Sequence, residues 1–142
     1  MRQTSILMIV LATVLTGCAT TSPAQQQAMD AAKLGRYQAA AGSPVRNINI
    51  FGSPSWDRID DSHLVYFIAP KRQYLMTLGG PCMAYAPSSY IVGITSNMGQ
   101  ISAGFDRIRM VHGPSCMIQE IRPLDPVKLR EGEAATAGST RA

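Results

Sequence analysis

Turn-forming residues divide residues 45–129 into short apolar or alternating runs, and this division limits the fold more than any other feature of the sequence. Short runs bounded by Gly, Pro, Asn and Ser clusters are typical of β-strands. We therefore expect an all-β domain with room for one short helix, in which about six strands form a small antiparallel, barrel-like or strongly coiled sheet. The predicted strands are residues 46–51, 64–69, 73–78, 90–95, 100–105 continuing through 107–111, and 116–122, and residues 83–89 suit a helical turn.

Two of the predicted strands depart from simple alternation. Residues 64–68 are aliphatic or aromatic at every position, so this strand should be central in the sheet or be covered by another element. Residues 100–111 change phase, which predicts a β-bulge near Asp106 and Arg107 that bends the strand. Apolar residues fall first at odd and then at even positions: Ile101, Ala103 and Phe105, followed by Ile108 and Met110.

A ten-residue apolar run, Ile6–Leu15, follows the single basic residue Arg2 at the N-terminus. The run is shorter than the roughly 20 residues that a transmembrane helix needs, and its layout is that of a secretory signal peptide. The adjoining residues, Leu15-Thr16-Gly17-Cys18, resemble the lipobox of bacterial lipoproteins. This resemblance implies that residues 1–17 are removed and that Cys18 carries two or more acyl chains, a stable membrane anchor. A short transmembrane helix with an incidental cysteine is the alternative.

Ala19 stands after the predicted lipidation site, where an Asp tends to retain lipoproteins at the inner membrane. We therefore expect anchoring in the outer membrane of a Gram-negative bacterium, with the domain facing the periplasm. Residues 18–44 contain few large apolar residues and are typical of a lipidated tether, within which Ser22, Pro23 and Gln25 suit the start of a helix. Residues 45–129 are the predicted β-rich domain, and residues 130–142 lack an apolar pattern and should be a disordered tail.

Lipidation of Cys18 would leave two cysteines, Cys82 and Cys116, in an oxidising compartment. We expect these two to form a disulfide, and a loop of this length would stabilise the domain by roughly 4 kcal/mol in the chain-entropy model. Two alternatives remain open: a pair of free buried thiols, or a metal site in which His63 and His112 join the cysteines. The metal site lacks the paired short spacings of a zinc finger, and a disulfide would consume its sulfur ligands.

A set of residues spread along the predicted domain forms a recognisable pattern: Trp56, Leu64, Tyr74-Leu75, Cys82, Ile94-Thr95-Ser96, Phe105-Asp106, Cys116-Met117-Ile118 and Glu120-Ile121-Arg122-Pro123-Leu124-Asp125. The pattern resembles small proteobacterial lipoproteins of the domain-of-unknown-function family 6491. The likeness covers about residues 56–125, and its most specific part is C-x-I-x-x-I-R-P. It implies a secreted, β-rich domain and brings no known catalytic residue to this chain. Cys82 and Cys116 belong to the pattern, which agrees with a structural bridge.

The charge of the chain is mildly basic and evenly spread. The formal net charge is +4, reduced by one when Arg2 is removed, and the longest basic run is Lys71-Arg72. The chain therefore lacks the electrostatic footprint of a nucleic-acid-binding protein. We expect the membrane as a partner through the lipid anchor, and an envelope protein or an anionic glycan or lipid as a further candidate. The candidate binding residues are Trp56, Lys71, Arg72, Arg107 and Arg109.

Candidate catalytic residues are few. Ser62 and His63 follow two Asp residues, but neighbouring strand residues point to opposite faces, and no G-x-S-x-G stretch is present. The three Asp residues at positions 57, 60 and 61 do not match the D-x-[DN]-x-[DN]-G calcium loop. We therefore assign no catalytic residue, metal site or cofactor and expect a non-enzymatic binding or structural module of the cell envelope. The alternatives are a small metal-dependent or hydrolytic enzyme that uses His63 and His112, and a small-molecule or lipid carrier with an apolar cavity.

Overall fold

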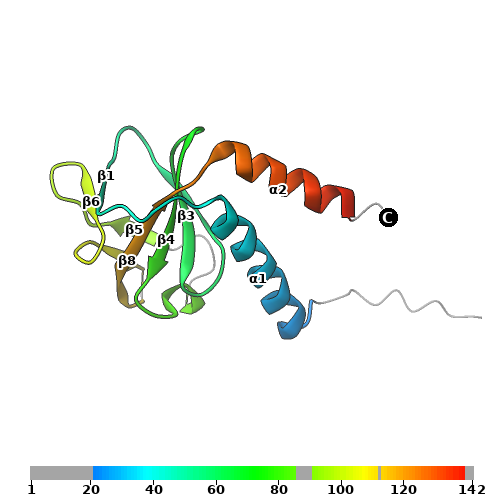
Figure 1. The fold of residues 1–142 in the computed structure, drawn as a ribbon. Helices are drawn as coiled ribbons and strands as arrows, with labels where there is room; N and C mark the ends of the chain where they lie inside the picture. Colours follow the sequence, from blue (N-terminus) through cyan, green and yellow to red (C-terminus); the bar gives the residue numbers. More distant parts are fainter. Residues whose placement is uncertain (1–20, 86–90, 112, 140–142) are drawn as a thin grey trace, which may run out of the picture.

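The computed structural model describes residues 21–85, 91–111 and 113–139 of the 142-residue chain. The elements within these residues follow each other along the chain as drawn in Figure 1. They are α1 (Pro23–Ala40), β1 (Asn47–Asn49), β2 (Ser55–Arg58), β3 (His63–Ala69), β4 (Arg72–Leu78), the 3₁₀ turn η1 (Cys82–Tyr85), β5 (Ile91–Ile94), β6 (Gln100–Ser102), β7 (Arg107–Met110), β8 (Ser115–Pro123) and α2 (Pro126–Ser139).

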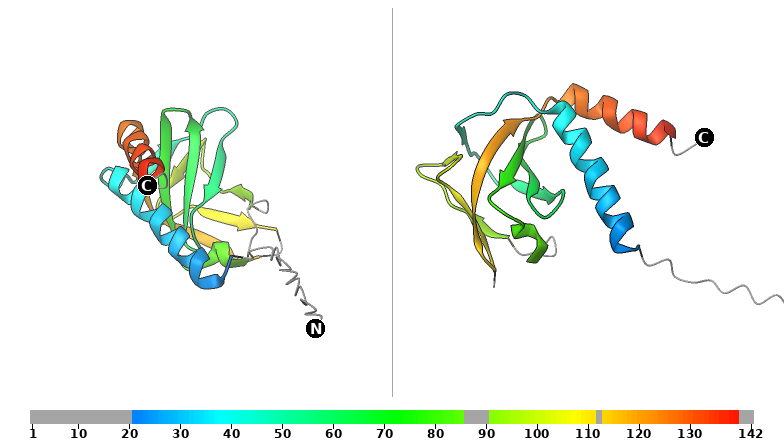
Figure 2. Two further views of the ribbon diagram at one scale, coloured as in Figure 1. Left: turned by 90° about the vertical axis from the view of Figure 1, so that its right-hand side faces the viewer. Right: turned by 60° about the horizontal axis from the view of Figure 1, so that its bottom comes forward.

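Six strands form one curled antiparallel sheet in the order β2-β3-β4-β8-β7-β5, and β1 pairs with β6 in a separate small sheet. The curled sheet is a half-barrel that is not closed between its two edge strands, β2 and β5 (Figure 2). Register shifts interrupt the ladders between β3 and β4, β4 and β8, and β5 and β7, and such irregularities increase local bending. The predicted all-β class with a strongly coiled antiparallel sheet and one disulfide is therefore confirmed.

The concave side of the sheet encloses the main hydrophobic core. Side chains from the small β1–β6 sheet, including Ile48 and Ile101, close this core on the side away from the helices (Figure 1). Six of its large side chains have no exposed surface: Leu64, Met76, Ile101, Ile108, Ile118 and Ile121. The interior of the half-barrel is thus filled by side chains, as in other small barrels.

Strand β3 is buried on both faces, as its uninterrupted apolar run predicts. Leu64 and Tyr66 belong to the concave core, whereas Val65 points to the convex face and packs with Ala40 of α1. Partly buried Leu34 and Tyr37 also join this second cluster. The C-terminal half of α1 therefore packs on the sheet as part of the domain, where the sequence predicted a tether with a helix starting at Ser22, Pro23 and Gln25.

Both helices begin with side-chain caps. Ser22 and Gln25 form a reciprocal capping box at α1, in which the Ser22 hydroxyl accepts from the Gln25 backbone N–H at 3.3 Å. The Asp125 carboxylate accepts from the Val127 N–H at 2.8 Å at the start of α2. Residues 130–139 lie within α2, which differs from the predicted disordered tail. The cap at Asp125 stabilises this helix, although its sequence lacks an apolar pattern. Leu129 also packs on the second hydrophobic cluster, on the convex face of the sheet.

A corner, rather than the predicted β-bulge, separates the two halves of residues 100–111. The chain turns at residues 103–105, where Gly104 has a φ of +76°, so that β6 joins β1 while β7 lies between β8 and β5. Phe105 is 76% exposed at this turn instead of facing the core. The phase shift therefore marks a change of partner strand. A bulge occurs instead in β8, where Gln119 stands between the residues that pair with Thr77 and Leu78.

Asp106 stabilises this corner through hydrogen bonds. It is a buried charged residue, with only 3% of its surface exposed. Its carboxylate accepts hydrogen bonds from the Thr95 hydroxyl at 2.8 Å and from the Ser102 N–H at 2.7 Å. Its backbone carbonyl accepts from the Ile118 N–H at 2.9 Å. The Thr95 hydroxyl in turn accepts from the Arg107 N–H at 2.8 Å. Asp106 thus connects β6, β8 and the segment after β5 at one point.

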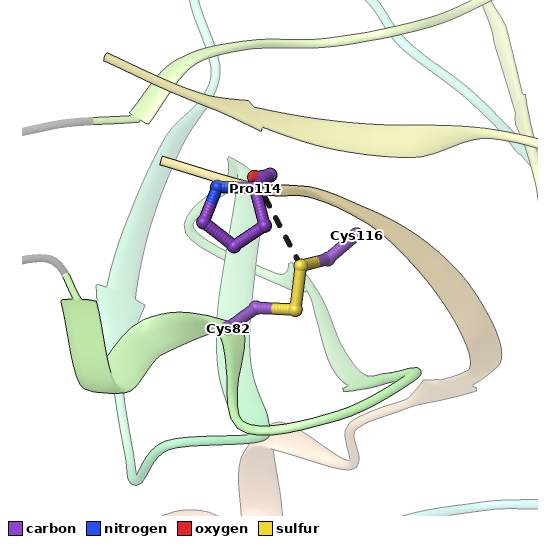
Figure 3. The surroundings of a disulfide bond; sticks show 3 residues. All are labelled: Cys82, Pro114 and Cys116. Atoms are coloured by element: carbon purple, nitrogen blue, oxygen red, sulfur yellow. Dashed lines mark hydrogen bonds between the residues drawn. A yellow bond between two sulfur atoms is a disulfide. The ribbon is translucent and has the colours of Figure 1, made fainter. Parts of the chain in front are cut away.

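The disulfide joins Cys82 at the start of η1 to Cys116 on the concave face of β8 (Figure 3). Both cysteines are buried, and the Pro114 carbonyl oxygen lies 4.0 Å from the Cys116 sulfur. A disulfide sulfur has no hydrogen to donate, so this approach is a packing contact. The predicted pairing is confirmed, and it excludes both the free thiols and the metal site that would use the same sulfurs.

Replacing both cysteines by alanine should lower the free energy of unfolding by roughly 4 kcal/mol, because the bridge closes a 34-residue separation in the unfolded chain. Urea unfolding of the oxidised wild type and of the double variant measures this difference. The reduced wild type is the matched control and should lose a similar amount. A loss below about 1 kcal/mol in both would show that the bridge adds little to the folded domain.

Asp106→Ala should lower the free energy of unfolding by about 2 kcal/mol, because it leaves the Thr95 hydroxyl and the Ser102 N–H without an acceptor in a partly buried corner. Asp106→Asn keeps one acceptor oxygen and should cost about half as much. Urea unfolding of the two variants gives the comparison. Equal losses, or an alanine variant as stable as the wild type, would contradict the role of the carboxylate.

Candidate functional site

An apolar groove of 290 Å³ lies at the open side of the half-barrel. Its walls come from both edge strands, with Trp56 on β2 and Ile94 on β5. The groove is lined by Ile50, Pro54, Trp56, Tyr66, Gly93 and Ile94, and none of these carries a charge. A concave apolar surface with a few polar groups is the usual form of a binding site.

Local strand pairing builds the aromatic part of the groove. Trp56 lies directly opposite Tyr66 in the antiparallel β2–β3 ladder, so that the two rings share one face of the sheet. Tyr66 is buried and Trp56 is half-buried. Burial raises the pKa of the Tyr66 hydroxyl above its usual value of 10.0, so this group is protonated at neutral pH and can donate a hydrogen bond. No hydrogen bond to the Tyr66 hydroxyl forms among the residues that the structure describes.

The structure does not bring the five predicted binding residues together. Lys71 lies in the β3–β4 turn, beside a different cleft. The Arg72 guanidinium lies over the Phe51 ring at 5.8 Å from its centroid, a cation–π geometry. Arg107 and Arg109 are exposed on the convex face of β7, while Ile108 between them points into the core. Of the five, only Trp56 lines the apolar groove.

Each of the three Asp residues at positions 57, 60 and 61 has a partner. Asp57 binds Lys33 of α1 at 2.7 Å, and Asp61 binds Arg58 at 2.7 Å. Both carboxylate oxygens of Asp60 lie 2.9 Å from Nδ1 of His63. These pairs tie the β2–β3 hairpin to itself and to α1. In residues 21–85, 91–111 and 113–139, no group of three or more His, Cys, Asp or Glu side chains is placed to hold a metal ion.

His63 and Asp60 line a cleft of 320 Å³ beside α1, together with Ser62 and Asp61. The Asp60–His63 contact is one half of a Ser–His–Asp arrangement. The other half is missing within the described part of the chain, because no hydrogen bond joins the Ser62 hydroxyl to His63. His112 and Cys18, which the sequence analysis also singled out, lie outside the described residues.

Sequence reasoning identified Trp56 but missed Tyr66 and the residues that complete the groove. Tyr66 could be found only once β2 is known, because pairing β2 with β3 as a hairpin places it opposite Trp56. Ile94 reaches the groove through the curl of the sheet, and Ile50 reaches it from the segment that follows β1, so neither position could be assigned to the groove from its local sequence.

The family model described as "Family of unknown function (DUF6491)" matches residues 1–140, nearly the whole chain. No curated protein and no solved structure matches the chain. Within the described residues, no helix is both long and apolar enough to cross a membrane.

Proposed function

The chain belongs to the family of unknown function DUF6491, and we propose that it is a cell-envelope lipoprotein that acts as a non-enzymatic binding module. Cys18 anchors it in the outer membrane of a Gram-negative bacterium, and the domain faces the periplasm. Two features support this placement: the lipobox-like residues 15–18, and a disulfide of the kind that persists in oxidising compartments.

The apolar groove between β2 and β5 carries the binding proposal. Both strands are edges of the sheet, and an edge strand is a template on which an extended segment of another protein can pair. Between these edges, Trp56 and Ile94 offer an apolar pocket for the side chains of such a segment. The partner is therefore an envelope protein that inserts an extended, apolar segment into the gap of the half-barrel.

The same groove argues against the other partners. Because no lining residue is charged, an anionic glycan or lipid head group would find no counter-charge there. A carrier that holds its ligand inside the barrel is also disfavoured, because the concave side is filled by side chains such as Ile108 and Ile118. The groove is a surface feature and suits recognition of a protruding segment.

Cys18→Ala should abolish lipid labelling and leave residues 1–17 attached, because processing depends on the modified cysteine. Labelling with a tritiated fatty acid, intact mass and separation of the two membranes on a sucrose gradient measure this. Ala19→Asp should shift the labelled protein from the outer to the inner membrane. The control, Cys82→Ala, should keep its label. Unchanged labelling of Cys18→Ala would overturn the anchor.

Peptides selected from a displayed random library on the full chain should share alternating large apolar residues, since alternate side chains of an extended segment would face the groove. Trp56→Ala should weaken their binding at least tenfold, because a large aromatic contact is worth about 2 kcal/mol or more in such an interface. Phe105→Ala, which removes an exposed aromatic side chain outside the groove, is the control and should bind normally. Equal binding by both variants would remove the groove from the proposal.

A further inference from the structure

A larger cleft of 490 Å³ lies on the convex side of the sheet and shares no lining residue with the apolar groove. It is bounded by α1, by α2 and by the tip of the β3–β4 hairpin. The Asp125 N–H donates to the Ala40 carbonyl at 2.9 Å, which joins the end of α1 to the start of α2. From this junction the two helices diverge (Figure 2), and the cleft opens along α2. Its volume lies in the range of about 300–1,000 Å³ that is usual for sites of small molecules.

The floor of the cleft is apolar. Phe67 of β3 and Leu129 of α2 face it, and both are partly buried against the convex core cluster. Pro70 and Pro126 add to this apolar surface. An alkyl chain or ring lying here would bury apolar area against side chains whose positions the core already fixes.

The rim of the cleft carries two cations without partners. Lys71 and Arg130 are exposed, and neither forms an ion pair or hydrogen bond within the part of the chain that the structure describes. Three cations of the described residues, Lys33, Arg58 and Arg122, have carboxylate partners; Lys33, for example, binds Asp57 at 2.7 Å. One carboxylate, Glu133, also lies on the rim, so the cleft has an excess of one positive charge.

Tyr37 adds a neutral donor to the same rim. Burial, and then the negative charge of Asp57, raise the pKa of its hydroxyl above the usual 10.0, while Arg36 opposes this rise and Glu133 adds to it. The hydroxyl is therefore protonated at neutral pH. It has no hydrogen-bond partner among the described residues, so it is available to an oxygen acceptor on a ligand.

We propose that this cleft binds a small, free amphiphile with one acidic head group. The carboxylate or phosphate of the ligand lies between Lys71 and Arg130, and its apolar body lies on Phe67 and Leu129. The two cations face a single anion, and the apolar floor explains why a bare anion would not suffice. This site goes beyond the proposed recognition of a protein segment and is independent of it.

Octanoate is a suitable probe because it combines one carboxylate with one alkyl chain. Equilibrium dialysis of labelled octanoate, with the full chain in phosphatidylcholine nanodiscs and empty nanodiscs as reference, measures the binding due to the protein. We expect one octanoate per chain, with acetate and octylammonium each binding at least tenfold more weakly. Equal binding of octylammonium, or of acetate, would overturn the proposal.

Charge reversal tests the rim directly. The double variant Lys71→Glu/Arg130→Glu should bind octanoate at least tenfold more weakly and should now prefer octylammonium, a gain that unfolding cannot produce. Lys128→Glu, the same change at an exposed position of α2 outside the cleft, is the matched control and should bind octanoate like the wild type. Equal losses in the control, or unchanged octanoate binding in the double variant, would contradict the site.

Two further outcomes separate the alternatives. Trp56→Ala should leave octanoate binding unchanged, because Trp56 lines the other groove, so failure of one proposal does not imply failure of the other. If octanoate does not bind, while the wild type held in phosphatidylcholine nanodiscs captures phosphatidylglycerol vesicles and the double variant in the same nanodiscs does not, the cations serve a membrane surface. That result would overturn a site for a free amphiphile.

Discussion

The two-sided burial of β3 is the constraint on which the rest of the structure depends. A strand of continuous apolar residues cannot leave either face in water, so the curled sheet encloses Leu64 and Tyr66 while α1 covers Val65. The position of α1 then fixes the junction with α2, because the Asp125 N–H binds the last turn of α1. Both candidate sites depend on this strand, because Tyr66 lines the apolar groove and Phe67 lines the convex cleft.

Features that depend on local residue patterns could be predicted from the sequence. These include the all-β class, the need to cover β3 and the positions of most strands. The pairing of Cys82 with Cys116 could be predicted for another reason, because the predicted lipidation of Cys18 leaves only these two cysteines. The corner at Asp106 could not be predicted, because a phase shift in the sequence is the same whether a strand bulges or changes its partner. Strand β2 was also missed: its four residues, with one large apolar side chain, give too short an alternation to detect.

The candidate sites were less predictable than the fold because they join residues that are distant in the sequence. Trp56 was among the predicted binding residues, but its neighbours in the groove come from other segments of the chain. Lys71 was predicted for its charge, whereas Arg130, the second cation of the same cleft, belongs to a segment that the sequence indicated as disordered. Arg107 and Arg109 share a face, as strand geometry requires, but that face is the convex side of β7.

The single tryptophan of the chain gives the protein a built-in optical label. Because Trp56 is half-buried at the apolar groove, any occupant that removes water from its indole should shift its emission toward the blue. The convex cleft contains tyrosine but no tryptophan, so its occupancy should leave that emission band almost unchanged. The two sites are therefore spectroscopically distinct in the unmodified protein, and their ligands can be followed separately in one sample.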